Sequence, residues 1–312
     1  MSGSYRAKKI RGFCHLYSGQ EALCVGMVAG LDMAKDGITT AYRCHGWAYT
    51  LGTPVDKVIS ELLGNANGCS GGKGGSMHMY GHHFYGGNGI VGAQVPIAAG
   101  IGLAYKYLNQ QGVSVGLYGD GASNQGQVFE AYNIAKLWKI PAIFVCENNK
   151  YGMGTSAERS SANTEYYTRG DYLPGMKIDA MDVLAVRNAT EYAREHALNE
   201  GPIVLEMETY RYHGHSMSDP DTTYREKNEI KDMRSNFDPI LGLKAKMIEQ
   251  GWATEAELKA YEKNIRAEVT AAVKFSEAQP EPPLNSLITD ILAGEKMVGV
   301  RGCDITIKYD EL

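Results

Sequence analysis

The clearest pattern of apolar residues lies in the middle of the chain. Residues 113–118 form a short apolar run typical of a buried strand, and residues 140–146 form a second run that begins next to Pro141. Between them, residues 127–138 carry apolar side chains at roughly helical spacing, among them Val128 and Tyr132. This order predicts a β-α-β unit with a right-handed crossover and two parallel strands.

The same reading continues toward the C-terminus. Residues 182–199 are expected to form a helix, residues 202–207 a strand, and residues 226–278 a charged helical region broken at Gly251. We therefore expect an α/β fold with an open, mainly parallel sheet flanked by helices. Three packing residues are predicted from their type: Trp47, Trp138 and Trp252.

Prolines at 280, 282 and 283 mark the one convincing boundary in the chain. We expect residues 1–279 to form a single α/β domain that includes the helical region. Residues 280–312 are expected to be a tail that packs on this domain or on a partner.

Composition narrows the class of protein. The 312 residues include 37 glycines, more than the usual ~7%, yet without the period of collagen. A net charge of −5 argues against a nucleic-acid or membrane-surface binder, and no apolar run reaches the ~18 residues of a membrane span. Six cysteines without a Cys-x-x-Cys pair indicate reduced thiols in an intracellular protein rather than a zinc site or a disulfide scaffold.

The glycines concentrate in one stretch. Ten of the 25 positions from Gly68 to Gly92 are glycine, and apolar residues are interleaved among them. Such a stretch inside a compact domain is typically functional, because glycine lets the backbone come close to a ligand.

Polar residues follow both strands of the predicted β-α-β unit. Asp120 stands in a Gly-Asp-Gly turn after the first strand, and Asn149 ends the Asn-Asn pair after the second. Because the carboxyl ends of parallel strands share one edge of the sheet, these side chains are expected to lie close together. Carboxylate, amide and main-chain oxygens suit Mg²⁺, and the glycines leave room for a phosphate group.

Residues 119–149 resemble the thiamine-diphosphate motif, which begins Gly-Asp-Gly and ends Asn-Asn about thirty residues later. Residues 11–16, 72–79, 85–95 and 210–220 are similar to the alpha subunits of pyruvate dehydrogenase. The resemblance covers nearly the whole chain and implies a thiamine-diphosphate-binding fold with thiamine diphosphate and Mg²⁺ as cofactors.

The resemblance also implies roles for individual residues. The Mg²⁺ ligands would be Asp120, Asn149 and the main-chain carbonyl of Tyr151. Other residues match cofactor-binding positions: Gly121 and Ala122 at the diphosphate, Tyr42 and Arg43 near a phosphate, and Gly89 and Val91 at the aminopyrimidine ring. His215 matches a histidine at the diphosphate and active site, and His15 one at the substrate channel, so both are expected to be catalytic.

By resemblance, the reaction is decarboxylation of pyruvate and transfer of the acetyl group to the lipoyl group of a dihydrolipoyl acetyltransferase. The glutamate that hydrogen-bonds the aminopyrimidine comes from a beta subunit in this family, so the working unit would be an α₂β₂ heterotetramer. Two alternatives stay open: the alpha subunit of a branched-chain 2-oxo acid or acetoin dehydrogenase, and a non-catalytic regulatory subunit.

Serine and threonine residues suggest regulation. Ser216 and Thr223 stand in a segment rich in glycine, proline and aspartate that predicts an exposed loop. By resemblance, Ser216, Thr223 and Ser156 match phosphorylation positions, which implies a regulatory kinase and phosphatase.

The resemblance places the protein in the mitochondrial matrix, or in the cytoplasm of a bacterium. Relatives usually begin with a further helix before the segment that starts here at Tyr5.

Overall fold

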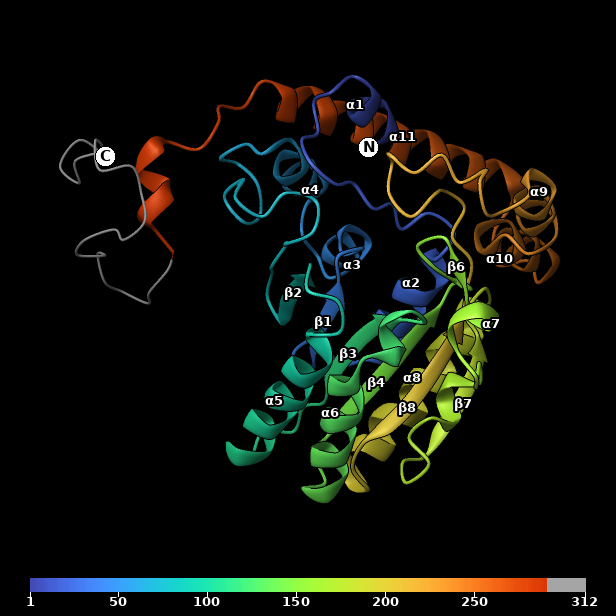
Figure 1. Ribbon diagram of the computed structural model, residues 1–312. Helices are drawn as coiled ribbons and strands as arrows, with labels where there is room; N and C mark the ends of the chain where they lie inside the picture. The colour runs from blue at the N-terminus through green and yellow to red at the C-terminus, as the bar shows by residue number, and fades with distance from the viewer. Residues whose placement is uncertain (291–312) are drawn as a thin grey trace.

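The structure, a computed structural model, describes residues 1–290 and is organised around a six-stranded parallel sheet in the order β2-β1-β3-β4-β8-β7 (Figure 1). Its strands are β1 (Gly37–Ala41), β2 (Phe84–Asn88), β3 (Ser114–Gly119), β4 (Ala142–Asn148), β7 (Gly175–Asp179) and β8 (Ile203–Glu208). A separate two-stranded hairpin joins β5 (Tyr151–Gly152) to β6 (Thr155–Ser156). The predicted open parallel sheet is confirmed.

Helices cover both faces of the sheet. One face carries α5 (Gln94–Tyr107) and α6 (Gly126–Leu137), and the other carries α2 (Glu21–Gly30) and α8 (Val183–Asn199) (Figure 1). Strand residues alternate between the two layers, so that Val145 packs toward α2 and α8 while Phe144 packs toward α5 and α6. The sheet is therefore buried on both sides, as the continuous apolar runs of β3 and β4 indicate.

The remaining helices lie mainly outside the two helical layers that cover the faces of the sheet. They are α1 (Ser2–Arg6), α3 (His45–Thr50), α4 (Val55–Leu63), α7 (Ala157–Ser160), α9 (Lys227–Asn236), α10 (Pro239–Glu249) and α11 (Glu255–Glu277), with 3₁₀ turns η1 (Ala122–Asn124), η2 (Tyr166–Thr168) and η3 (Leu284–Ile288). A capping box of Thr254 and Glu257 starts α11. This helix packs on α4, where the hydroxyls of Ser60 and Ser276 lie 3.0 Å apart.

The predicted elements agree with the observed ones to within about two residues. The predicted helix 182–199 begins at Val183, because Asp182 is its N-cap and accepts hydrogen bonds from the backbone N–H groups of Leu184 and Ala185. The charged region 226–278 separates into α9, α10 and α11. Trp47 is fully buried as predicted, but Trp138 and Trp252 are 49% and 59% exposed, so the prediction was wrong for these two.

The predicted tail is described only as far as residue 290. There, Lys73 pairs with Asp290, and the carbonyl of Pro280 accepts a hydrogen bond from Ala66 N–H. The boundary at residue 279 stays a prediction.

Among residues 1–290, no helix combines the length and the apolar character needed to cross a bilayer.

One buried carboxylate connects three elements at the amino end of the sheet. Asp36 accepts a hydrogen bond from Val113 N–H at 3.0 Å, just before β3, and one from Arg194 Nε of α8 at 2.6 Å. Its side chain is fully buried, and its negative charge is compensated by the guanidinium.

Glycine allows α2 and α8 to approach closely. A Cβ atom on Gly26 would lie 2.7 Å from both the carbonyl oxygen of Val183 and Cβ of Val186, and Gly30 is equally confined by Arg187 and Thr190. We therefore predict that Gly26→Ala lowers the free energy of unfolding by about 1–3 kcal/mol through overpacking. Thermal or urea unfolding of the purified chain measures this.

The matched control is Gly242→Ala in α10, where an added Cβ meets nothing within 4 Å. It is expected to be neutral or slightly stabilising, because alanine is the better helix former. Equal effects of the two substitutions would contradict the packing argument.

Candidate active site

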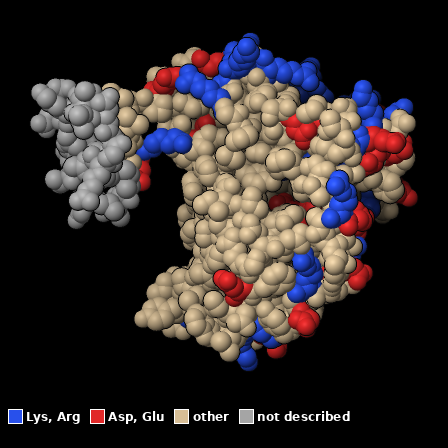
Figure 2. Space-filling view, in the orientation of Figure 1, with Lys and Arg blue, Asp and Glu red and all other residues tan. Residues whose placement is uncertain are grey.

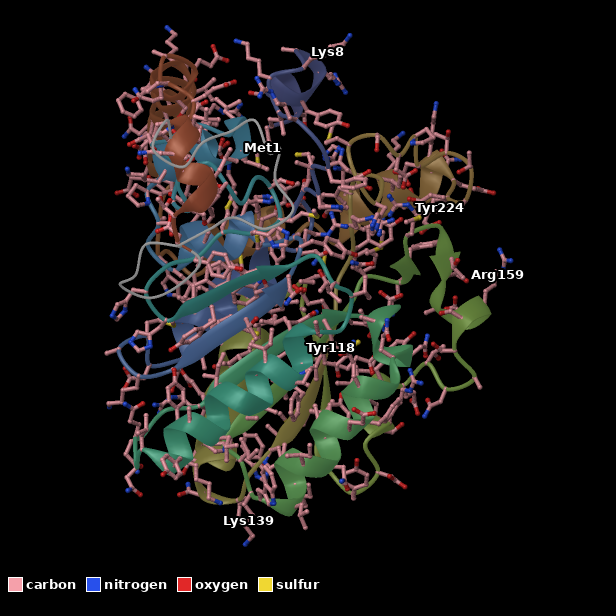
Figure 3. The ribbon with its side chains drawn as sticks, turned by 60° about the vertical axis from the view of Figure 1, so that its left-hand side comes forward. Met1, Lys8, Tyr118, Lys139, Arg159 and Tyr224 are labelled. Carbon is pink, nitrogen blue, oxygen red and sulfur yellow. The ribbon has the colours of Figure 1, made fainter. Side chains whose placement is uncertain are left out.

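Most of the predicted site residues follow the carboxyl ends of strands, whereas His15 lies in the segment before α2. Tyr42 and Arg43 follow β1, Gly89 and Val91 follow β2, and Asp120 follows β3. Asn149 follows β4, and the segment that carries His215 follows β8. Because the strands are parallel, these ends lie along one edge of the sheet. Figure 3 shows Tyr224 beyond this edge and Lys139 at the opposite end of the sheet.

Asp120 is the most unusual carboxylate at this edge. It is 1% exposed, and its buried Oδ2 atom has no hydrogen-bond partner among residues 1–290. Burial raises the pKa of Asp120 to about 6. An orphaned buried carboxylate oxygen is costly unless a cation compensates it, so this atom fits a metal ligand.

The backbone around Asp120 leaves little space for side chains. A Cβ on Gly121 would lie 3.2 Å from Cα of Gly152, and one on Gly152 would lie 3.9 Å from Oδ2 of Asp120. The hairpin of β5 and β6 therefore packs against the Gly-Asp-Gly turn. Tyr151, the residue before Gly152, lies next to this contact. Gly119 pairs with Glu147, so the carboxyl ends of β3 and β4 are adjacent; the proximity of the Asp120 and Asn149 side chains stays a prediction.

Asn149 is oriented by a residue that the sequence did not point to. Its Nδ2 donates to Oε1 of Gln20, which is 1% exposed, at a distance of 3.1 Å. Its Oδ1 faces the N–H of Tyr151 at 3.4 Å. Gln20 thus fixes which end of the amide is the oxygen. Among the described residues, no cluster of three His, Cys, Asp or Glu forms a metal site, so a cation here would need amide and carbonyl oxygens.

Two buried arginines donate to backbone carbonyls rather than to acids. Arg43 donates to the carbonyls of Leu16 at 2.6 Å and His215 at 2.9 Å, and burial lowers its pKa to about 10. Arg211, 1% exposed, donates to the carbonyls of Tyr151 at 3.1 Å and Met153 at 3.0 Å. Guanidinium charges held by neutral carbonyls make the edge attractive to an anion. Arg211 was not predicted from the sequence as an individual site residue.

A cavity of about 640 Å³ opens at this edge. Its walls include several of the predicted residues: His15, Tyr42, Gly89, Val91, His215, Ser216 and Thr223. Asp120, Asn149 and Tyr151 are not among its lining residues. The structure therefore gathers the predicted residues into two groups, one around the cavity and one around the orphaned carboxylate.

Three aromatic rings meet in the cavity wall. The ring of His15 lies 4.4 Å from that of Tyr42 and 4.9 Å from that of His215, between centroids. Nδ1 of His15 lies 2.9 Å from the carbonyl oxygen of His215 and must donate, which leaves Nε2 as the acceptor. Burial, and then the charge of Arg43, lowers the pKa of His215 to about 3; burial likewise lowers that of His15 to about 4. Both rings are therefore neutral at pH 7.

The loop after β8 is ordered by its own side chains. Oδ2 of Asp219 accepts from His215 N–H at 2.7 Å and from the hydroxyl of Tyr224 at 2.5 Å. Arg225 donates to the carbonyls of Arg211 and His213 at 2.6 and 2.9 Å. These bonds hold the segment that carries His215 against the cavity.

The expected exposure of this loop was wrong for Ser216. Its side chain is buried, and its Oγ lies 2.8 Å from Oγ of Ser218, because the Asp219 and Arg225 contacts fold the loop inward. Thr223 is exposed as predicted, and Ser156 is half-buried. Any enzyme that modifies Ser216 would need this loop to open.

Five cysteines are free thiols: Cys14, Cys24, Cys44, Cys69 and Cys146. Cys303 lies outside the described residues. Burial raises the pKa of the Cys44 thiol to about 12, so it is not a nucleophile. The expectation of reduced cysteines holds for the described part of the chain.

Comparison with known proteins gives a family and several relatives. The family described as "Dehydrogenase E1 component" matches residues 1–285. The mitochondrial pyruvate dehydrogenase E1 component subunit alpha of Sminthopsis macroura is 54% identical over 306 residues, which cover 98% of this chain and 84% of that protein. The somatic form from Homo sapiens is 54% identical over 98% of this chain and 78% of its own length. The type II protein of Ascaris suum is 58% identical over 92% and 73%.

We predict that Asp120→Asn stabilises the magnesium-free chain at pH 7.5 by about 1–2 kcal/mol, which raises the melting temperature by a few degrees. The substitution removes a buried charge whose Oδ2 atom has no hydrogen-bond partner within the described residues. Differential scanning calorimetry in the presence of a chelator measures the change.

Asp36→Asn is the control, because that buried carboxylate is paired with Arg194. It should lower the melting temperature, since the guanidinium loses its buried acid at 2.6 Å and keeps only Asp32 at 3.7 Å. A decrease for Asp120→Asn as well would show that Asp120 has a purely structural role.

Proposed function

The chain belongs to the dehydrogenase E1 component family, and we propose that it is the alpha subunit of a pyruvate dehydrogenase. With a beta subunit it would decarboxylate pyruvate and transfer the acetyl group to the lipoyl group of a dihydrolipoyl acetyltransferase. The observation that carries this proposal is the orphaned Oδ2 of Asp120 at the strand edge, beside two arginines that donate to backbone carbonyls.

The residues fit Mg²⁺ and thiamine diphosphate. Asp120, the amide oxygen of Asn149 and the carbonyl of Tyr151 would hold the cation, with Gln20 fixing the amide orientation. Gly121 and Ala122 offer backbone at the start of η1 for the diphosphate. Thiamine diphosphate, when bound, supplies the carbanion that attacks the 2-keto carbon and stabilises the charge left after loss of CO₂.

The side chains and backbone of this chain would bind and orient the cofactor and exclude water from the cavity. Gly89 and Val91 form the wall where the aminopyrimidine would lie, and Arg43 keeps the segment of His215 in place through its carbonyl. Because burial keeps the rings of His15 and His215 neutral, each ring has one N–H donor and one acceptor nitrogen; the N–H of His15 binds the carbonyl of His215, so its Nε2 is left as an acceptor of hydrogen bonds. Neutral rings also add no further positive charge beside the two arginines.

A partner chain is needed to complete the site. The family's glutamate for the aminopyrimidine comes from the beta subunit, and an exposed apolar face next to the cavity supports such a partner here. On α5, Ile97, Leu103 and Tyr107 are 42%, 37% and 83% exposed, and Lys106 is its only charged residue. Figure 2 shows a mostly uncharged surface over this side of the molecule. Since α5 begins three residues after Val91, a chain docked on it would reach the cavity.

The relatives are named as mitochondrial proteins, and we propose the mitochondrial matrix for this chain as well. Their names also favour pyruvate over branched-chain 2-oxo acids or acetoin. A purely regulatory subunit would have no use for the buried, orphaned carboxylate of Asp120.

We expect the chain to decarboxylate pyruvate only when it is assembled with a beta subunit and supplied with thiamine diphosphate and Mg²⁺. Asp120→Asn should lower this activity at least about 100-fold, since it removes the charged metal ligand. Release of CO₂ is measured in parallel for pyruvate and for branched-chain 2-oxo acids, and consumption is measured for acetoin, which has no carboxyl group to lose. Turnover by the chain alone, or preference for another substrate, would contradict the proposal.

Phosphorylation of Ser216 is proposed to inactivate the enzyme. A phosphate adds about −1.5 to −2 charges, and Ser216 is buried next to the residues that would face the cofactor. We expect Ser216→Glu to reduce activity of the assembled enzyme at least about tenfold, by displacing the loop and repelling the diphosphate. Steady-state turnover of the assembled enzyme measures this.

Thr222→Glu in the same loop is the control, because Thr222 is exposed and should tolerate the charge. Unchanged activity of Ser216→Glu would argue against regulation at this position. Thr223 and Ser156 remain proposed as further phosphorylation positions, and a regulatory kinase and phosphatase as partners.

A further inference from the structure

The first half of the glycine-rich stretch encloses a carboxylate of the same chain. Glu61, in the last turn of α4, is fully buried. Its Oε2 accepts hydrogen bonds from the N–H groups of Ser70 at 2.7 Å and Gly72 at 2.9 Å. Its Oε1 accepts from those of Gly74 at 2.7 Å and Gly75 at 3.1 Å. One carboxylate thus binds four backbone donors within six residues.

The glycines are required for this enclosure. A Cβ on Gly68 would lie 2.2 Å from Oε2 of Glu61, and one on Gly74 would lie 1.9 Å from the carbonyl oxygen of His78. Gly72 has a φ of +75°, a left-handed conformation that favours glycine. Gly68 is therefore explained by the carboxylate of Glu61, and Gly72 and Gly74 by the tight folding of the loop backbone around it, whereas Gly89 further along the stretch lines the cavity.

The enclosed loop supports the cavity wall. The hydroxyl of Ser70 donates to the carbonyl of His78 at 3.0 Å, and Nδ1 of His78 lies 3.1 Å from the carbonyl oxygen of Gly87 in β2. Met77 lines the cavity, and a Cβ on Gly89 would lie 3.2 Å from Cε1 of the His78 ring. The position of Met77 and Gly89 thus depends on a loop whose backbone is held by Glu61.

We propose that Glu61 is a positioning residue for the cofactor site: it acts through the loop 68–78 and sets the wall formed by Met77 and Gly89. Glu61 is not among the residues that line the cavity. A neutral side chain cannot replace it, because glutamine would present an NH₂ group to two of the four N–H donors. The identity of the ligand rests on the proposed function, whereas the support of the loop does not.

The test uses Glu61→Gln in the chain assembled with its beta subunit. Trypsin reports on the loop, because Lys73 is the only lysine or arginine between Lys57 and Lys106. We expect cleavage of the 73–74 bond, followed by mass spectrometry, to be at least about tenfold faster than in the unmodified protein. The dissociation constant for thiamine diphosphate with Mg²⁺ should rise at least about tenfold, by titration calorimetry.

Two further variants keep the result interpretable. Glu61→Asp retains the charge on a shorter side chain and should give intermediate cleavage and affinity, which also serves if the glutamine variant does not fold. Asp36→Asn removes a buried carboxylate at the opposite end of the sheet and should change neither measurement more than about twofold, although it lowers stability.

The proposal is overturned if cleavage at Lys73 and cofactor affinity in Glu61→Gln stay within twofold of the unmodified protein. It is also overturned if Asp36→Asn changes both as much, because the effect would then be general destabilisation. If the unmodified assembly does not bind thiamine diphosphate, the proposed function fails, while the cleavage measurement still tests the role of Glu61.

Discussion

Parallel pairing of all six strands is the constraint on which the rest of this structure depends. It places the carboxyl end of every strand at one edge and forces each connection to return across a face of the sheet. Residues separated by more than 150 positions, such as Arg43 and His215, therefore meet within 2.9 Å. At the opposite edge, Asp36 stabilises the sheet because its hydrogen bonds join the starts of two strands to α8.

The functional edge has unbalanced charges that a stable core would avoid. Arg43 and Arg211 donate to carbonyls, and Oδ2 of Asp120 has no partner in the part of the chain that the structure describes. Glu147, also buried, accepts a hydrogen bond from the hydroxyl of Tyr17 at 2.7 Å, and burial raises its pKa to about 7. Such an arrangement lowers stability and is compensated when a cation and a multiply charged anion bind together. The electrostatics of the fold and the chemistry of the proposed cofactor thus complement each other.

The glycine surplus has more than one physical cause. Gly26 and Gly30 allow two helices to approach, Gly121 allows a hairpin to approach the Gly-Asp-Gly turn, and the glycines around residue 72 wrap the carboxylate of Glu61. A high glycine content by itself indicates only that the backbone approaches other atoms closely, not which atoms these are. The partner in each case is another part of the chain, and it lies between 4 and more than 150 residues away.

The sequence by itself determined the β-α-β unit, the parallel sheet and the positions of Asp120 and Asn149, because these follow from local periodicity and from polar residues directly after apolar runs. The family resemblance added Arg43 and His215. Tertiary structure alone decided that Gln20 orients Asn149, that Arg211 reaches the carbonyl of Tyr151 and that Ser216 is buried. It also decided that Glu61 organises the glycine loop and that Trp138 is exposed. These facts depend on contacts between segments distant in the chain. A local pattern of side chains does not specify which distant segment packs against it.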